Sequence, residues 1–370
     1  MKILYFFQEL STPMFQWQRL HLIDELERNG HEVEVLNPLL YKNPEEANEV
    51  LCNMIDTNTY DLFFTNICYY KMLFGESLDY IHSKGIPAVC LRCDNLVIPY
   101  NDKELAPKFD LVWLTSIETQ PLYKKWGAKT IFLPYAANPV TFAPTNNTSI
   151  NRVCFIGTPY GSRSIMINTL TSAKVELDLY YGGNKTKSPS TFTPKFEIIT
   201  PSKYSVHFSR LKFAEGRKLI WGTLVNKFRG QTQVIDNEYL HRFPSVSVNG
   251  LSSYYSRYNL CLASTSTNHT DALKNPLKIV NLRNFEIPMS GGIEICKFNP
   301  ELAEYFEADK EIIFYESKEE LIDKAVYYTK TASAQEICTI KINARKRAES
   351  DHTWMRRFEL IFKKLGIKIK

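Results

Sequence analysis

Short apolar runs alternate with helical patterns along the first 133 residues, and this alternation constrains the fold more than any other feature of the chain. Six runs have the length and composition of buried strands, at residues 2–7, 32–36, 61–65, 87–92, 111–114 and 130–133. Two of the helical patterns between them end at Gly30 and Gly85, as helices commonly do. Strands that alternate with helices form parallel sheets, because a crossover helix returns the chain to the same end of the sheet. The sequence therefore predicts a Rossmann-like α/β domain.

A second alternation begins after a proline-rich segment at residues 133–144. Further strands are expected at residues 152–156, 175–181, 259–263, 293–296 and 312–314. The chain ends in a helical pattern with one apolar face, from Trp354 to Leu365. Apolar residues make up 44% of the 370, which is sufficient for two cores. We therefore expect an N-terminal domain at 1–138, a C-terminal domain at 139–351 and a last helix at 352–370.

Positive charge is concentrated in an insertion at about 184–240, within the expected C-terminal domain. Residues 184–234 contain ten Lys or Arg and two acidic residues, although the whole chain carries a net charge of only +5. Apolar side chains interleave with these cations between residues 203 and 229. Two interpretations remain open, namely a peripheral contact with an anionic membrane or a solvated helix whose cations face outward. A nucleic-acid interface is disfavoured, because no DNA- or RNA-binding module pattern is present.

The segment 277–296 combines the residue types that a nucleotide requires. Lys278 and Arg283 precede Glu286, and Gly291-Gly292 forms a small-residue turn before the apolar run at 293–296. Cations and backbone N–H groups at a helix start bind phosphate, and a carboxylate accepts hydrogen bonds from both hydroxyls of a ribose. The alternative is a surface pair, since Arg283 and Glu286 have the i, i+3 spacing of neighbours on a helix.

The spacing of Arg283, Phe285, Glu286 and Gly291 resembles the donor-site signature of GT-B glycosyltransferases, in the group 1 branch that includes spore-maturation-protein-like (CgeB-like) enzymes. The Gly157 to Arg163 segment and the ending His352-Thr353-Trp354 resemble the same family. The resemblance implies two Rossmann-like domains facing across a cleft, with the last helix crossing back to the N-terminal domain. It also implies that the C-terminal domain holds a nucleoside-diphosphate sugar and the N-terminal domain holds the acceptor.

In such enzymes cations and helix dipoles, and not a metal ion, stabilise the leaving diphosphate. The resemblance assigns donor binding to Gly157, Arg163, Lys278, Arg283, Glu286, Gly291 and Gly292. Many relatives carry a second glutamate eight residues before the one that corresponds to Glu286, whereas this chain has Lys278 there. The first loop, 8–13, also lacks the glycine pair that is often found in the family. These departures leave the stereochemistry of the reaction open.

An inverting transferase also needs a general base near the carboxyl ends of the strands. Asp94 follows the expected strand 87–92, and Glu9 follows the first strand, so both are candidate catalytic residues. The alternative for Asp94 is a turn cap or an ion pair with Arg92. Cys90 and Cys93 form a single CxxC without a second pair, which favours ordinary thiols over a zinc site.

The sequence therefore predicts a hexosyl- or deoxyhexosyltransferase of bacterial surface-polysaccharide or glycoconjugate synthesis, with a glycan or lipid-linked acceptor. No cofactor and no metal are expected. The N-terminus lacks the apolar stretch of a signal peptide, so the expected location is cytoplasmic, with a peripheral contact at the inner face of the membrane. Two alternatives are a nucleotide-sugar epimerase on the same fold and a catalytically degenerate GT-B binding module.

Overall fold

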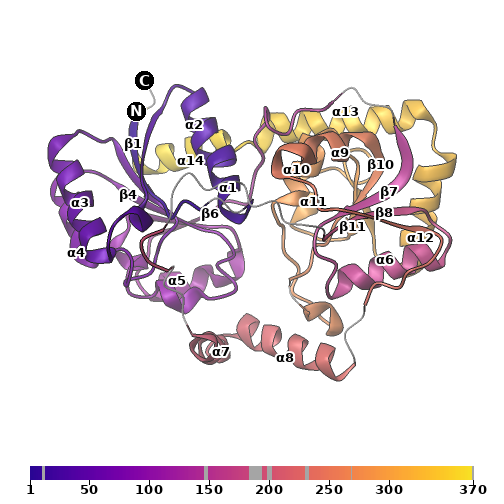
Figure 1. The fold of residues 1–370 in the computed structure, drawn as a ribbon, viewed down its shortest axis with the longest axis horizontal. Helices are drawn as coiled ribbons and strands as arrows, with labels where there is room; N and C mark the ends of the chain where they lie inside the picture. Colours follow the sequence, from indigo (N-terminus) through magenta and orange to yellow (C-terminus); the bar gives the residue numbers. More distant parts are fainter. Residues whose placement is uncertain are drawn as a thin grey trace. The chain divides into compact units, whose positions relative to one another are not determined.

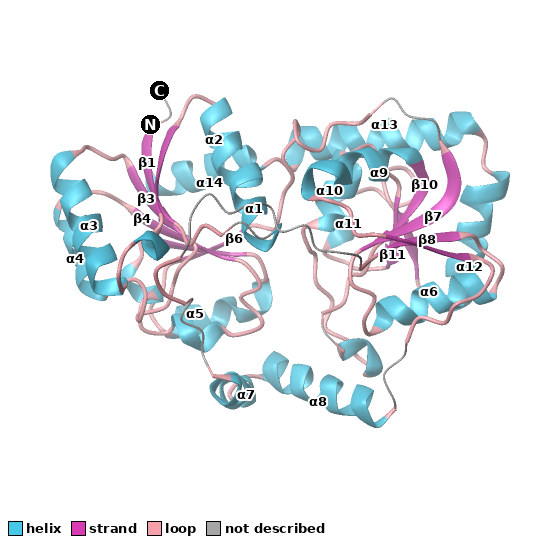
Figure 2. Ribbon diagram, viewed as in Figure 1, coloured by secondary structure: helices cyan, strands magenta, loops and turns pink. Residues whose placement is uncertain are grey.

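The computed structural model describes residues 1–10, 13–145, 149–182, 194–197, 202–229, 233–267 and 269–368. The chain forms two compact units. The first contains Met1–Pro134, Lys187–Arg217 and Trp354–Lys370, and the second contains Tyr135–Thr186 and Lys218–Thr353. Each unit is a parallel sheet with helices on both of its faces (Figures 1 and 2).

The sheet of the first unit has six parallel strands in the order β2-β1-β3-β4-β5-β6. Its strands are β1 (Lys2–Phe6), β2 (Glu32–Leu36), β3 (Leu62–Thr65), β4 (Ala88–Arg92), β5 (Leu111–Leu114) and β6 (Thr130–Phe132). The helices of this unit are α1 (Pro13–Gln18), α2 (Asp24–Arg28), α3 (Pro44–Thr57), α4 (Gly75–Ser83), α5 (Gln120–Lys125), α7 (Lys203–Leu211) and α14 (Trp354–Leu365).

Both faces of the first sheet are covered, which explains why its strands are apolar without alternation. Neighbouring residues of a strand point to opposite faces of the sheet. Phe63 packs into the core beneath α3 and α4. Phe64, on the other face, packs against Phe358 of α14, and the centroids of these two rings are 5.3 Å apart. Trp354 of α14 lies 5.6 Å from Trp113 of β5. The last helix therefore completes the core of the first unit.

The sheet of the second unit also has six parallel strands, in the order β12-β11-β10-β7-β8-β9. Its strands are β7 (Ile150–Ile156), β8 (Leu177–Tyr180), β9 (Leu240–Phe243), β10 (Tyr258–Leu262), β11 (Glu294–Lys297) and β12 (Ile313–Tyr315). Its helices are α6 (Ser162–Ser172), α9 (Leu251–Arg257), α10 (Arg283–Met289), α11 (Leu302–Tyr305), α12 (Lys318–Val326) and α13 (Ala334–Asp351). The strand order reverses between β7 and β10, and ligands of doubly wound sheets bind at such a reversal.

The predicted α/β GT-B class is confirmed, but the sequence did not predict β9. This strand lies at the sheet edge and has the sequence Leu-His-Arg-Phe, of which only Leu240 is buried. An edge strand tolerates polar side chains, so it lacks the continuous apolar pattern of a central strand.

The basic insertion is divided between the two units, whereas the sequence alone assigned it to the C-terminal domain. Lys187–Arg217 belongs to the first unit, and the chain from Lys218 belongs to the second. The boundary falls within helix α8 (Ala214–Phe228). Lys185 and Lys187, two of the counted cations, lie outside the described residues. No helix in the described part of the chain is long and apolar enough to cross a membrane.

Candidate donor-binding site

Two loops of the second unit meet at the reversal of strand order. One follows β7, runs through residues 157–161 and enters α6. The other follows β10 and leads to α10. Because β7 and β10 are paired in parallel, with Leu260 opposite Val153, their carboxyl ends lie side by side. Arg163, in the first turn of α6, and Arg283, the first residue of α10, are thereby carried to the same edge of the sheet.

The absence of a side chain at Gly157 makes room for Arg283. A Cβ atom at this position would lie 2.6 Å from both terminal nitrogens of the Arg283 guanidinium. The φ angle of Gly157 is +135°, a value that residues with a side chain rarely adopt. Its N–H group donates to the carbonyl of Tyr180, at 3.0 Å, so it is not the phosphate donor that the sequence predicted. Gly157 serves the site by letting Arg283 approach the backbone.

Arg163 is held beside this position by an aromatic ring and a backbone carbonyl. Its guanidinium lies 4.5 Å from the ring centroid of Tyr160, and it donates to the carbonyl of Thr158 at 3.2 Å. Burial lowers the pKa of Arg163, and the nearby Arg283 lowers it further while Asp271 acts in the opposite direction. Neither arginine forms an ion pair with a carboxylate of the described residues. Arginine side chains keep their positive charge in proteins.

Two nearby guanidinium groups that form no ion pair repel each other, and an anion between them removes this cost. The N-terminus of α6 adds to the positive potential, because its cap, Gly161, provides no side-chain hydrogen bond. The arrangement is suited to a diphosphate, which accepts bidentate hydrogen bonds from arginine.

Glu286 lies one turn after Arg283 and is buried. Burial raises the pKa of Tyr255, while the charge of Arg283 lowers this pKa and the charge of Glu286 raises it. Tyr255, Arg283 and Glu286 therefore lie in one neighbourhood. The Tyr255 hydroxyl is buried and makes no hydrogen bond to the described residues, and the same holds for Oδ2 of Asp271. Buried polar atoms are normally satisfied, so these two indicate room for a polar ligand. Sequence reasoning missed both residues, since no motif distinguishes them.

Lys278 is placed differently from the two arginines. It forms an isolated bridge with Ser266, and its Nζ atom lies 5.4 Å from the ring centroid of Phe298, beyond β11. No described contact joins it to Arg163 or Arg283. The structure therefore brings Gly157, Arg163, Arg283 and Glu286 together, and it leaves Lys278 in another part of the loop.

Gly291 and Gly292 end helix α10. Gly291 has φ +68° and donates to the carbonyl of Pro288, and Gly292 donates to the carbonyl of Ile287. These are the hydrogen bonds of a helix C-cap, so their N–H groups are occupied. The phosphate-binding role expected for the two glycines is therefore not supported. The Gly-Gly pair resembles a phosphate loop in sequence, but it lies at the opposite end of the helix from Arg283.

The two candidate bases, Glu9 and Asp94, belong to the first unit. Arg19 donates two hydrogen bonds to the Glu9 carboxylate, at 2.6 and 2.9 Å, which occupy lone pairs that a base requires. Asp94 is exposed and has φ +51°, an uncommon conformation for a residue with a side chain. The buried Asn95 holds this turn by accepting from backbone N–H groups after β5. Positive φ values of this kind occur often at functional sites.

A buried ion pair lies near Asp94, and no sequence pattern predicted it. Arg92 donates to Asp102 at 2.6 Å, and Tyr123 also donates to this carboxylate. Burial raises the pKa of Asp102, although Arg92 opposes this shift. Asp102 and Tyr123 come from the segment after β4 and from α5, so they are far apart in the chain.

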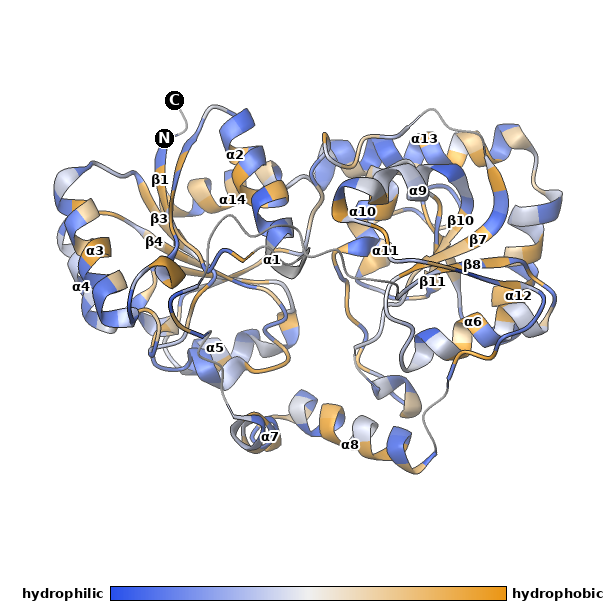
Figure 3. Cartoon of the chain, in the orientation of Figure 1, coloured by the Kyte–Doolittle hydropathy of each residue, from blue (hydrophilic) through white to orange (hydrophobic). Residues whose placement is uncertain are grey.

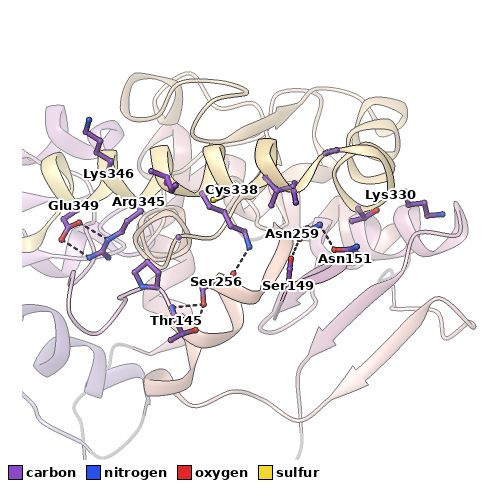
Figure 4. Close-up of a pocket in the computed structure, with 18 of the residues that line it drawn as sticks. Thr145, Ser149, Asn151, Ser256, Asn259, Lys330, Cys338, Arg345, Lys346 and Glu349 are labelled. Atoms are coloured by element: carbon purple, nitrogen blue, oxygen red, sulfur yellow. Dashed lines mark hydrogen bonds and ion pairs between the residues drawn. The ribbon is translucent and has the colours of Figure 1, made fainter. Parts of the chain in front are cut away.

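A pocket of about 920 Å³ opens beside α13, at the amino ends of β7 and β10 (Figure 4). Asn151 and Asn259 line it, together with Lys341 and Arg345. Lys341 donates to a carbonyl of α9, and Arg345 donates to the carbonyls of residues 139 and 142. These two cations thus bind the protein itself. Because the pocket lies at the amino end of β7, it is separate from the arginines at the carboxyl end.

The described residues contain no group of three or more His, Cys, Asp or Glu that is arranged to hold a metal ion. Arginine side chains are the charges that the site offers to an anion.

Solved structures share this architecture over nearly the whole chain. An α-glucosyltransferase in complex with UDP superposes with a TM-score of 0.61, at 13% identity, covering 99% of this chain and 100% of that one. The chain has the GT-B fold. Sucrose-phosphate synthase from Thermosynechococcus elongatus gives a TM-score of 0.56, at 15% identity over 99% of both chains. HepE from Anabaena, in complex with UDP and glucose, gives 0.55, at 12% identity over 98% of this chain and 99% of that one.

Sequence comparison adds a more local finding. A family profile described as "Glycosyl transferase-like" matches residues 208–363. The match contains α8, the loop after β10, Arg283 and Glu286, and it ends within α14. No curated protein matches the sequence significantly.

Proposed function

We propose that the protein is a glycosyltransferase that moves a sugar from a nucleoside-diphosphate sugar to an acceptor hydroxyl. The observation that carries the proposal is the pair Arg163 and Arg283, two guanidinium groups that form no ion pair with the described residues, at the strand reversal of the second unit. Glu286 lies one turn after Arg283. The structural neighbours with UDP or glucose in their complexes support the same donor class.

In the proposed reaction the acceptor oxygen forms a bond to the anomeric carbon, and the bond from that carbon to the diphosphate breaks. Arg163 and Arg283 stabilise the charge that develops on the leaving diphosphate. Glu286 accepts hydrogen bonds from the ribose. The acceptor proton goes to a base of the first unit, and we assign this role to Asp94 in preference to Glu9, because Arg19 occupies Glu9. No metal enters this proposal.

The finer assignments follow from the same proposal. They are a CgeB-like group 1 transferase, a hexosyl or deoxyhexosyl donor, and a glycan or lipid-linked acceptor in bacterial surface-polysaccharide or glycoconjugate synthesis. We also propose a cytoplasmic location, with peripheral contact to the inner face of the membrane through residues 203–229.

Calorimetric titration with UDP, GDP and dTDP sugars, in the presence of EDTA, tests the donor site. We expect one nucleotide to bind the wild type, and we expect Glu286→Gln to weaken that binding at least about tenfold, as for loss of a charge-assisted hydrogen bond. The matched control is Glu304→Gln, which changes an exposed carboxylate on α11. If no nucleotide binds, or if both variants bind like the wild type, the site assignment is wrong.

A time course by NMR separates transfer from the two alternatives. Conversion of the donor sugar without an acceptor indicates an epimerase. Binding without hydrolysis or transfer indicates a degenerate binding module. Slow donor hydrolysis that is lost in Glu286→Gln supports the transferase.

A further inference from the structure

Helix α7 turns its large apolar side chains toward solvent. Tyr204 is 80% exposed and Phe208 is 67% exposed, and with Leu211 they follow the i, i+4, i+7 spacing of one helix face. The opposite side faces the protein: Ser209 is buried, and Arg210 donates to the carbonyl of Val97. A surface helix normally buries its apolar face, so the polarity of α7 is inverted.

Helix α8 also exposes large apolar side chains, although it buries Leu219. Trp221 is 60% exposed and Phe228 is 87% exposed, with Leu224 between them on the same face. Its inward side carries the buried Leu219 and Gly222. Figure 3 shows apolar and polar bands alternating along α8. The outer faces of these helices thus carry large apolar side chains as well as the cations that the sequence placed there.

The charge of the two helices indicates what covers these faces. Residues 202–229 contain seven Lys or Arg, and Glu215 is the one acidic residue among them. Lys218, on the exposed side of α8, lies next to the apolar stripe, and Lys227 is exposed near its end. Long cationic side chains beside exposed Trp, Tyr and Phe are the composition of helices that lie in the interface of an anionic bilayer. A protein partner that binds through an apolar patch would not by itself require such an excess of positive over negative residues on these helices.

We propose that the outer faces of α7 and α8 bind an anionic lipid surface, with Tyr204, Phe208, Trp221 and Phe228 entering the interface and the flanking cations contacting lipid headgroups. This inference specifies the membrane contact of the proposed function. It rests on the proposed function only for the biological role of the contact, which is to bring the enzyme to a lipid-linked acceptor. Vesicle binding requires no nucleotide and nucleotide binding requires no vesicle, so the two proposals fail independently.

The lipid-binding helix α8 also contacts the loop beside the arginines. A Cβ atom on Gly222 would lie 2.9 Å from the carbonyl oxygen of His269 and from Cα of Thr270. Arg229 donates to the carbonyl of Ala272, at 3.0 Å. The loop between these contacts carries Asp271, which acts on the pKa of Arg163. The inward side of the helix that carries the proposed membrane face therefore packs on the loop of Asp271, beside the candidate donor site.

Co-sedimentation with vesicles tests the proposal. The full chain should bind vesicles of phosphatidylcholine with about 30% phosphatidylglycerol, which carry the negative surface charge of an anionic membrane. It should bind vesicles of pure phosphatidylcholine far more weakly. Trp221→Ser with Phe228→Ser should weaken binding at least about tenfold. The control Ile342→Ser removes an equally exposed apolar side chain from α13 and should leave binding unchanged.

The electrostatic part is tested by Lys218→Gln with Lys227→Gln. We expect an affinity loss of about thirtyfold for two cations, and a comparable loss for the wild type in high salt. Lys346→Gln on α13 is the matched control. Quenching of tryptophan fluorescence by brominated lipid should fall sharply in Trp221→Phe, since the other tryptophans are buried or half-buried.

Three results would overturn the proposal. They are the absence of vesicle binding by the wild type, equal binding by the Trp221/Phe228 variant, and a wild-type dimer in sedimentation velocity that this variant abolishes. The last result would show that a second copy of the chain covers these faces.

Discussion

At the scale of single residues, Gly157 decides where the charge of Arg283 lies. We expect Gly157→Ala to displace the Arg283 guanidinium, because the new Cβ would meet it at 2.6 Å, and to weaken nucleotide binding about tenfold or more. Gly182→Ala is the matched control, since Gly182 has φ +84° and a Cβ atom there would meet no other atom within 4 Å. Both variants should lose about 1–2 kcal/mol of stability from backbone strain. Equal nucleotide affinity in the two would contradict this role.

Glu294 allows a second prediction at the residue scale, about pH. Burial raises its pKa to about 8 from an ordinary 4.5, although hydrogen bonds from Asn284 and Cys296 oppose the shift. The unfolded chain ionises Glu294 above pH 4.5 and the folded chain does not, so its contribution to stability is full below that value and is lost as the pH rises to about 8.

We therefore expect Glu294→Gln to become more stable relative to the wild type by about 1.4 kcal/mol for each pH unit between about pH 5 and pH 8. Urea denaturation at several pH values measures this difference. Glu304→Gln, at an exposed position, should show no such trend. A constant difference between Glu294→Gln and the wild type would contradict the raised pKa.

At the scale of elements, the contact of α8 with the loop at residues 269–272 connects the insertion to the donor site. Gly222→Val would place a branched side chain against His269 and Thr270, where even a Cβ is 2.9 Å away. We expect the loop to move and nucleotide affinity to fall about tenfold, with faster hydrogen exchange in the loop. Thr223→Val adds a similar side chain at the next, exposed position and should bind like the wild type. Loss of affinity in both variants would instead indicate a general effect on the helix.

Helix α10 separates groups that the signature at residues 277–296 placed in one site. Arg283, Glu286 and the Gly291-Gly292 pair are close in sequence, which suggested a single phosphate and ribose site. The segment between them folds as α10, so the arginine begins the helix and the glycines end it. A helix of seven residues separates its ends by about 10 Å, at about 1.5 Å per residue.

At the scale of the whole molecule, the twelve residues of helix α14 complete a core that begins with β1. Trp354 is fully buried and lies near both Trp17 and Trp113, with centroid distances of 5.8 and 5.6 Å. We expect Trp354→Ala to destabilise the first unit by about 3–5 kcal/mol. Leu360→Ala, on the exposed side of the same helix, should change stability by less than about 0.5 kcal/mol. Urea unfolding followed by hydrogen exchange of β1 and β5 measures both, and equal effects would contradict the packing.

The sequence by itself determined the two parallel sheets, because buried strands on doubly covered sheets must be apolar throughout and crossover helices must be amphipathic. Arg163, Arg283 and Glu286 became site candidates because their motifs resemble the donor site of GT-B enzymes. Only the tertiary structure decided which groups are available. It showed that Arg19 occupies Glu9, that the glycine N–H groups serve a helix end, and that the aromatic residues of α7 and α8 face outward. These outcomes depend on contacts between residues far apart in the chain, and periodicity gives the faces of a helix without saying which of them the fold covers.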